Sequence, residues 1–323
     1  VICAAAIYGG TFNLFNKTLR DLGIEFDFID PAASEEELNN AFKENTKAVF
    51  TETLSNPSLD VCDLELYAKC AHAHGCPLIV DNTFATPVNC RPFEWGADIV
   101  VHSTSKYMDG HAVALGGCIV DSGNFDWNNG KFHMLTTPDE TYHGVTYTEH
   151  FGKAAYIAKA RVHLMRDLGT QMAPQNAFLL NLGLETLALR MERHFENGLA
   201  VAKYLQNHEK VSWVNFPALE SSPEYEKCKK YLGGKTCGVV SFGVKGGREG
   251  AMKFMDSLKL ANIVVHVADA RTSVLHPAST THRQLTEEQL LEAGVAPDLI
   301  RLSVGIENVN DIIADLEQAM EKM

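Results

Sequence analysis

Residues 97–107 read ADIVVHSTSKY, a short apolar run that ends in three hydroxyls and a lysine. Residues 77–81 read PLIVD, a second apolar run that ends in a carboxylate. A short apolar run bounded by polar residues is consistent with a buried strand. In open α/β sheets, ligands bind beyond the carboxyl ends of the strands. Asp81 and the segment from Ser103 to Lys106 are therefore the first candidates for chemistry.

The alternation of strands and helices around this stretch predicts an α/β fold. Residues 1–4 (VICA) read as the middle of a buried strand, and we expect further chain upstream of them. Strands that alternate with amphipathic helices imply a mostly parallel sheet, covered on both faces. The β-branched and apolar runs predict strands over 46–52, 77–80, 97–102 and 117–120, and one helix over 60–74.

The second half of the chain predicts a connector followed by a smaller α/β unit. Residues 121–150 lack a clean period and indicate an irregular excursion, whereas Pro174 is expected to open a long helix through Met191. We predict a cofactor-binding large domain over 1–190 and a C-terminal small domain over 191–323. Within the latter, strands are expected over 238–244, 263–267 and 299–304, and helices over 248–260 and 308–323.

Composition excludes several classes of partner. The net charge of −13 argues against nucleic acid and anionic membranes, because either would favour clustered Lys and Arg. No apolar run approaches the ~20 residues of a membrane span. The eight cysteines are scattered, without a Cys-x-x-Cys pair or the His spacing that zinc needs. We expect a cytoplasmic protein with reduced thiols, no metal and small-molecule partners.

Asp81 and Lys106 each allow an ordinary interpretation and a chemical one. Asp81 could cap a turn or helix, and Lys106 could be a solvated loop residue. A lysine used for imine chemistry instead needs surroundings that lower its pKa. The hydroxyls beside Lys106 can donate to phosphate oxygens, and an aspartate can keep a pyridine nitrogen protonated. Together these groups would suit a phosphorylated pyridine aldehyde.

Six stretches resemble the Cys/Met-metabolism family of pyridoxal-phosphate enzymes, and the resemblance spans nearly the whole chain. It implies a fold-type I, transferase-like α/β architecture, with a mostly parallel large domain and a smaller C-terminal domain. It also implies pyridoxal 5'-phosphate as the cofactor. The matching stretches are 8–11 (YGGT), 52–57 (ETLSNP), 81–87 (DNTFATP), 103–107 (STSKY), 276–282 (HPASTTH) and 301–307 (RLSVGIE).

The resemblance assigns roles on the cofactor side position by position. Lys106 would carry the cofactor as an imine and later shuttle protons between substrate carbons. Asp81 would pair with the pyridinium nitrogen. Tyr8 would stack on the ring and assist leaving-group or proton transfer, and Ser103 and Ser105 would hold the phosphate.

On the substrate side, the resemblance implies that Asn56 contacts the ring hydroxyl and that Arg301 clamps the substrate carboxylate in a bidentate pair. Each position keeps an ordinary alternative: Tyr8 as a turn aromatic, Asn56 within a simple turn, and Arg301 as a surface arginine. Six matching stretches in one order make these alternatives improbable together.

His266 departs from the family pattern, which more often has Asn there. It either alters substrate contacts or is a satisfied histidine at a strand end.

Residues 125–127 (FDW), 130–132 (GKF), 142–144 (YHG) and 173–179 (APQNAFL) are similar to the O-acetylhomoserine sulfhydrylase branch of this family. The branch resemblance implies elimination of acetate from O-acetylhomoserine and addition of sulfide or a thiol, which gives homocysteine or a thioether amino acid. It also implies a tetramer built from dimers.

Two alternatives stay open. One is a methionine γ-lyase or cystathionine-type lyase, in which water instead of a thiol completes the reaction. The other is a cofactor-deficient fragment without catalysis, because the family's phosphate cradle would lie upstream of Tyr8.

Overall fold

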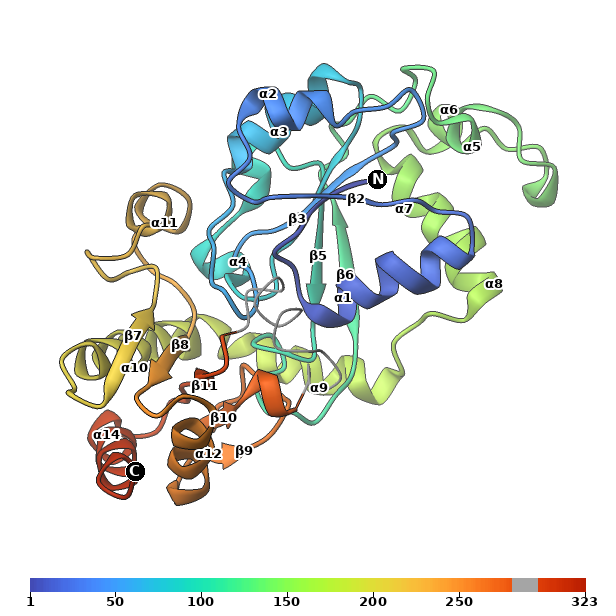
Figure 1. The fold of residues 1–323 in the computed structure, drawn as a ribbon. Helices are drawn as coiled ribbons and strands as arrows, with labels where there is room; N and C mark the ends of the chain where they lie inside the picture. The colour runs from blue at the N-terminus through green and yellow to red at the C-terminus, as the bar shows by residue number, and fades with distance from the viewer. Residues whose placement is uncertain (281–295) are drawn as a thin grey trace.

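The computed structural model describes residues 1–280 and 296–323, and it contains two β-sheets (Figure 1). The first has six strands in the order β2-β1-β3-β4-β5-β6, all parallel except β6, which pairs antiparallel with β5. The mostly parallel sheet predicted from sequence is therefore present. Its strands are β1 (Ile2–Ala4), β2 (Asp27–Ile29), β3 (Val49–Glu52), β4 (Leu78–Asp81), β5 (Ile99–Ser103) and β6 (Gly117–Asp121).

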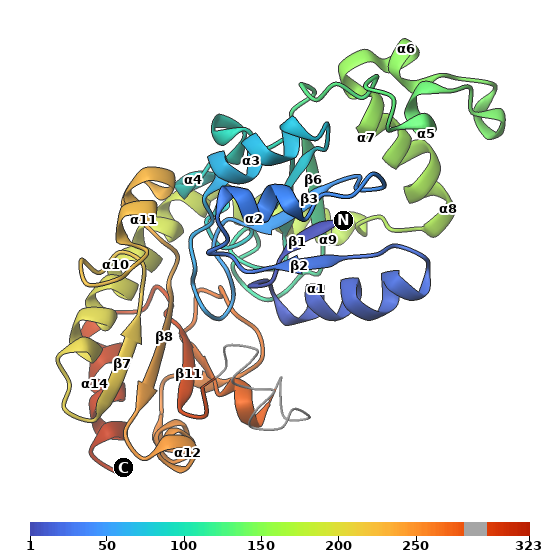
Figure 2. The ribbon, with the colours of Figure 1, turned by 45° about the horizontal axis from the view of Figure 1, so that its top comes forward.

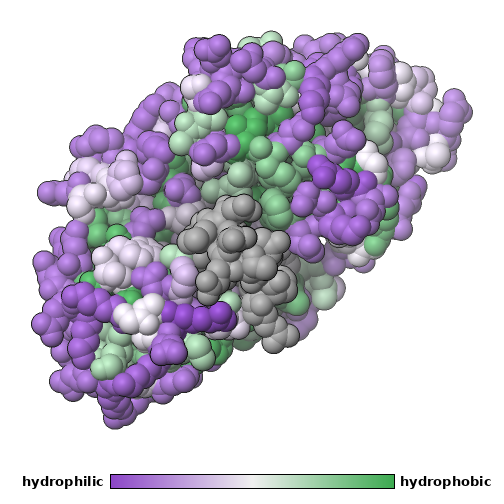
Figure 3. Space-filling model, viewed as in Figure 1, coloured by the Kyte–Doolittle hydropathy of each residue, from purple (hydrophilic) through white to green (hydrophobic). Residues whose placement is uncertain are grey.

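Helices cover both faces of this sheet, with α2 and α3 on one side and α1 on the other (Figure 2). α2 begins with a capping box between Ser34 and Glu37, and α3 begins where the Asp63 carboxylate accepts from the Leu66 N–H. In the space-filling view, hydrophobic residues gather over the strands of this sheet (Figure 3). The elements are α1 (Gly9–Asn13), η1 (Leu14–Leu19), α2 (Glu35–Asn40), α3 (Leu64–Ala73), α4 (Thr86–Asn89) and η2 (Pro92–Trp95).

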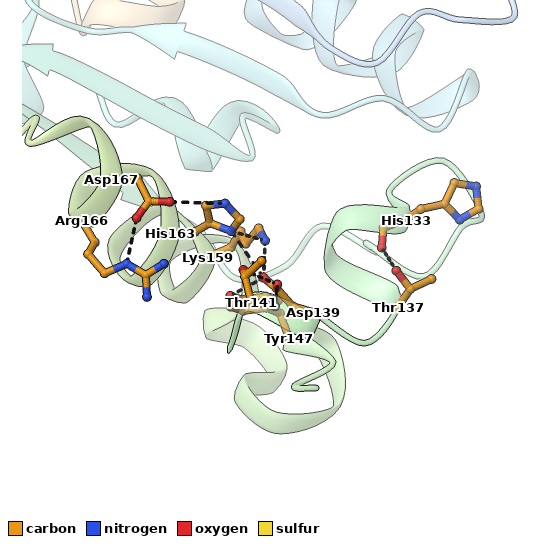
Figure 4. A network of polar contacts seen from close by, with 9 residues as sticks. All are labelled: His133, Thr137, Asp139, Thr141, Tyr147, Lys159, His163, Arg166 and Asp167. Atoms are coloured by element: carbon orange, nitrogen blue, oxygen red, sulfur yellow. Dashed lines mark hydrogen bonds and ion pairs between the residues drawn. The ribbon is translucent and has the colours of Figure 1, made fainter. Parts of the chain in front are cut away.

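The excursion after β6 contains short helices instead of a structureless loop. A buried ion pair anchors it: Lys159 Nζ lies 2.6 Å from Asp139 Oδ2 (Figure 4). The Tyr147 hydroxyl donates to the same carboxylate over 3.0 Å, and His163 Nδ1 lies 2.7 Å from Lys159 Nζ. The elements are α5 (His133–Thr136), η3 (Glu140–Tyr142), α6 (Tyr147–Phe151), η4 (Gly152–Ala154), α7 (Ala155–Lys159), η5 (Ala160–Met165) and α8 (Arg166–Leu168).

The long helix expected from Pro174 is two helices, α9 (Pro174–Glu185) and α10 (Leu187–Gln206), which meet at Thr186. Thr186 has φ −109° and ψ 3°, outside the helical region, so the chain turns there. The predicted domain boundary at 190 falls in the first turn of α10. Because α10 contacts both α4 and the strands β7 and β8, that boundary stays a prediction.

The second sheet has five strands in the order β7-β8-β11-β10-β9 and packs against α10 and α12, and α14 packs against these two helices. Its core is separate from that of the first sheet and includes Phe242, Phe254 and Ile300. The strand expected over 263–267 is only two residues long. The elements are β7 (Val211–Asn215), α11 (Tyr225–Leu232), β8 (Val239–Val244), α12 (Gly247–Ser257), β9 (Asn262–Ile263), β10 (Ser273–Leu275), η6 (Pro277–Ser279), β11 (Leu299–Ser303) and α14 (Val309–Met320).

Two further sequence expectations concern the cysteines and membrane-spanning segments. All eight cysteines are free. Among the described helices, none is both long and apolar enough to cross a membrane. Thr281 and His282, the end of one family-like stretch, lie outside the described residues.

Candidate active site

A cavity that is open to solvent lies at the carboxyl edge of the first sheet. Ligands of α/β proteins bind at this edge. The ends of β3, β4 and β5 and the turn before α1 supply its walls, so one edge of the sheet brings together residues nearly a hundred positions apart. The lining residues are Tyr8, Glu52, Leu54, Asn56, Asp81, Thr83, Phe84, Ser103 and Lys106.

Lys106 lies just past β5, in a loop held from two directions. Arg190 Nη1 in α10 donates to the carbonyl of Tyr107 over 2.6 Å, and the Tyr107 hydroxyl accepts from the N–H of Gly238 over 2.9 Å. Burial, and secondarily the positive charge of Arg301, lower the pKa of Lys106 to about 8. A lysine of this kind supplies a neutral, nucleophilic amine near physiological pH, which imine chemistry requires.

Asp81 is the last residue of β4, and a chain of hydrogen bonds connects it to the end of β5. The Thr83 hydroxyl donates to Asp81 Oδ1 over 2.5 Å and accepts from the N–H of Ser103 over 2.8 Å. Burial raises the pKa of Asp81, while the hydroxyl and N–H of Thr83 oppose that rise. A carboxylate in such surroundings is stabilised by a cation that enters the cavity.

Glu52 is a further carboxyl in the cavity wall, and sequence reasoning gave it no role. Burial, and secondarily the charge of Asp81, raise its pKa well above the ordinary value. Its Oε1 accepts from the N–H of Tyr8 over 2.8 Å, so it fixes the backbone that carries this tyrosine. Like Asp81, Glu52 ends a strand in an otherwise apolar run, and that position was the available signal.

Asn56 and Arg301 connect the cavity wall to the second sheet. Arg301, buried in β11, donates from Nη1 to Asn56 Oδ1 over 3.2 Å and from Nη2 to the carbonyl of Val265 over 2.9 Å. Its Nε has no hydrogen-bond partner among residues 1–280 and 296–323. Burial lowers the pKa of Arg301 to about 10. Arg301 itself does not line the cavity and contacts it through Asn56.

The other predicted residues differ in their access to the cavity. Tyr8 lines it with a side chain that is 46% exposed, so its ring is available to a ligand. Ser103 also lines it. Ser105 is buried outside the cavity lining, and its hydroxyl accepts from the N–H of Gly116 over 3.0 Å. Ser103 is therefore better placed than Ser105 to meet a ligand.

His266, the residue that departs from the family pattern, lies beside Lys106. Its Nδ1 is 3.4 Å from Lys106 Nζ, although it does not line the cavity. Its two sequence interpretations, an altered substrate contact and a satisfied histidine at a strand end, both stay predictions. Within the described part of the chain, no group of three or more His, Cys, Asp or Glu side chains could hold a metal ion.

Comparison with known proteins identifies the family to which the chain belongs. Residues 1–321 match the family model described as Cys/Met metabolism PLP-dependent enzyme. The O-acetyl-L-homoserine sulfhydrylase of Leptospira meyeri is 45% identical, over 100% of this chain and 75% of the relative. The homocysteine synthase of Schizosaccharomyces pombe is 48% identical, over 99% of this chain and 75% of the relative.

A solved structure agrees with these relatives. It is a crystal structure of a Campylobacter jejuni protein described as an O-acetylhomoserine (thiol)-lyase, and it contains N'-pyridoxyl-lysine-5'-monophosphate. The two folds superpose with a TM-score of 0.94 at 40% identity, over 99% of this chain and 76% of the other.

Proposed function

The chain belongs to the Cys/Met-metabolism family of pyridoxal-phosphate-dependent enzymes, and we propose that it converts O-acetylhomoserine and sulfide into homocysteine and acetate. A thiol in place of sulfide would give a thioether amino acid. The support is that relatives named O-acetyl-L-homoserine sulfhydrylase and homocysteine synthase are 45% and 48% identical over nearly the full chain.

The observation that carries the proposal is the pairing of Lys106 with Asp81 in one cavity. An amine with a pKa lowered to about 8 fits an aldehyde, and a half-buried carboxylate fits a protonated pyridine nitrogen. The residues present therefore fit pyridoxal 5'-phosphate. When bound, this cofactor supplies an electron sink that stabilises carbanions next to the substrate nitrogen.

The proposal gives each residue one task toward the cofactor. Lys106 would hold the cofactor through its aldehyde carbon and would move protons between substrate carbons. Asp81 keeps the pyridine nitrogen protonated, with Thr83 fixing its Oδ1. Ser103 donates to the phosphate, and Ser105 is assigned the same task although its hydroxyl contacts Gly116.

Toward the substrate, three residues complete the proposed site. The exposed ring of Tyr8 stacks on the cofactor and assists the departure of acetate. Asn56 would contact the ring hydroxyl, and Arg301, whose Nη1 donates to Asn56, would bind the substrate carboxylate. Arg301 reaches this position from the second sheet, so the substrate would lie where the two sheets meet.

A lyase that eliminates without thiol addition, of the methionine γ-lyase or cystathionine type, is the alternative within the family. It would use the same lysine and the same cofactor, and it would release a keto acid and ammonia. The names of the similar proteins favour replacement over elimination.

The proposal also covers assembly and location. We expect a homotetramer built from dimers, and hydrophobic side chains that are exposed on β6 and α9 are available for such contacts: Ile119, Val120 and Phe178. We expect a cytoplasmic protein, because eight free thiols suit a reducing compartment.

The experiment is a product analysis of the chain with added pyridoxal phosphate. With O-acetylhomoserine and sulfide, we expect homocysteine and acetate in equal amounts and little keto acid. Keto acid and ammonia as the main products, or rapid breakdown of methionine, would favour the lyase alternative. No product from either substrate, with no cofactor bound, would favour the fragment without catalysis.

A further inference from the structure

A histidine from the second half of the chain lies within contact distance of the lysine that is central to the proposed function. His266 Nδ1 is 3.4 Å from Lys106 Nζ, at the long limit of a hydrogen bond. The two residues are 160 positions apart. The other ring nitrogen, Nε2, is buried and has no hydrogen-bond partner in the described part of the chain. The contact with Lys106 is thus the polar interaction that the ring makes here.

The segment around His266 is held by bonds on both sides. Arg301 Nη2 donates to the carbonyl of Val265 over 2.9 Å, and the N–H of Ala268 donates to Ser303 Oγ over 2.8 Å. Ala268 has φ +70°, a left-handed conformation that alanine rarely adopts. Strained backbone persists where the surroundings over-determine it. The imidazole is therefore placed by a fixed frame.

The same frame connects to the loop of Lys106. The N–H of Ala270 donates to the carbonyl of Gly110 over 2.8 Å, and the N–H of Gly110 donates to the carbonyl of Lys106 over 2.8 Å. Two backbone hydrogen bonds therefore connect the segment that carries His266 to the backbone of Lys106. The distance between the two side chains follows from this backbone arrangement.

Charge decides which way the hydrogen bond runs. Burial, and secondarily the charge of Lys106, lower the pKa of His266, with Arg301 acting in the same direction. Asp269 and Asp109 oppose this effect more weakly. The imidazole is therefore neutral near pH 7, and a lysine ammonium has donors only. Toward the ammonium form of Lys106, Nδ1 therefore accepts, and Nε2 then carries the ring proton.

We propose that His266 is a positioning residue for Lys106, and that its neutral imidazole accepts a hydrogen bond from the free lysine at Nδ1. The bond directs Nζ and stabilises the ammonium form that Lys106 adopts after it takes up a proton. The inference rests on the proposed function, in which Lys106 must leave the cofactor to move protons. The proton stays on Lys106 and is not transferred to His266. The two side chains interact through the hydrogen bond alone.

The test measures how readily Lys106 is modified in the full chain after its cofactor has been removed. An amine-specific acylating reagent is applied from about pH 6 to about pH 11, a range that includes the ordinary lysine pKa. Mass spectrometry of the Lys106 peptide measures the extent of acylation at each pH. The midpoint is the pH at which acylation of Lys106 is half-maximal. In His266→Leu we expect the midpoint to fall by roughly one pH unit, because the ammonium loses its acceptor.

Two comparison variants separate the hydrogen bond from general effects. His266→Asn places an acceptor oxygen near the position of Nδ1, and we expect it to restore the wild-type midpoint. His133→Leu removes an exposed histidine outside the cavity lining and should change nothing. Circular dichroism shows whether each variant is folded. In the enzyme loaded with cofactor, His266→Leu should lower kcat and shift its pH profile, with KM unchanged.

Equal midpoints in wild type and folded His266→Leu would overturn the proposal. So would a His266→Asn midpoint equal to that of His266→Leu, because the acceptor would then have no effect. The labelling needs no turnover, so it is independent of product formation. If the wild type forms no homocysteine while the midpoints move as expected, the proposed function fails and the contact between His266 and Lys106 stands.

Discussion

At the scale of single residues, Lys106 is set apart from an ordinary lysine by its surroundings. A pKa lowered from 10.5 to about 8 raises its neutral fraction at pH 7 on the order of several hundredfold. This change requires burial and the neighbouring Arg301, which lies 195 positions away in the sequence. The assignment of Lys106 comes from the sequence, and the fold supplies the surroundings that lower its pKa.

The lowered pKa of Lys106 predicts how cofactor capture depends on pH. Because the neutral amine attacks the aldehyde, the rate should rise with pH and level off above about 8. Stopped-flow absorbance after mixing the cofactor-free protein with pyridoxal phosphate measures this rate. A midpoint near the ordinary lysine value, about 10.4, would contradict the effect of burial.

Arg301→Ala tests the assigned carboxylate contact. Loss of a buried, charge-assisted pair should raise KM for O-acetylhomoserine on the order of a hundredfold, with a smaller effect on kcat. Steady-state kinetics measure both values. Arg193→Ala, which removes an exposed arginine paired with Glu196, is the control. An unchanged KM in Arg301→Ala would mean that the carboxylate is held elsewhere.

Glu52→Gln tests the carboxyl that sequence reasoning missed. Its raised pKa means that folding favours the protonated form, so the native state loses stability as pH rises from the unfolded-state value toward the folded-state value. The glutamine variant cannot ionise. In the cofactor-free protein, the Tm of Glu52→Gln minus the Tm of wild type should therefore increase as the pH rises from about 5 to about 8. Parallel pH curves for the two proteins would contradict burial of this carboxyl.

At the scale of elements, the helices and strands that could be predicted are those whose apolar residues recur with a regular period. Strands β3, β4, β5, β6, β8 and β11 lie within two or three residues of the predicted runs. The break at Thr186 was not predictable, because leucines continue the apolar pattern on both sides of it. The short β9 is also followed by a tertiary contact, because Arg301 in β11 donates to the carbonyl of Val265.

Lys159→Met tests whether the buried ion pair anchors the excursion. The carboxylate of Asp139 would lose its cation, and residues 133–147 should become more sensitive to proteolysis. Lysine pairing lowers the pKa of Asp139, so the anchor should also weaken in wild type as pH falls toward acid. Limited proteolysis with mass spectrometry measures both effects.

The matched control for this variant is Lys153→Met, which removes an exposed lysine from the same region. Equal cleavage rates in the two variants would mean that the ion pair with Lys159 does not hold the excursion. Activity need not change in either variant, because neither lysine lines the cavity.

At the scale of the whole molecule, the site combines both sheets. Lys106, Asp81 and Ser103 come from one edge of the first sheet, whereas Arg301 and His266 come from the second-sheet region. The first group could be predicted from strand ends and family-like motifs. Glu52 also ends a strand, so its position could have been predicted in the same way. The contact of His266 with Lys106 depends on how distant segments pack, and no local pattern carries that information.

The most direct measurement is borohydride reduction of the full chain with bound pyridoxal phosphate, followed by a peptide map. We predict one pyridoxyl label, on Lys106, and no label or visible absorbance band in Lys106→Ala. Label on another lysine, or an equal band in Lys106→Ala, would contradict the assignment of Lys106 and with it the proposed site.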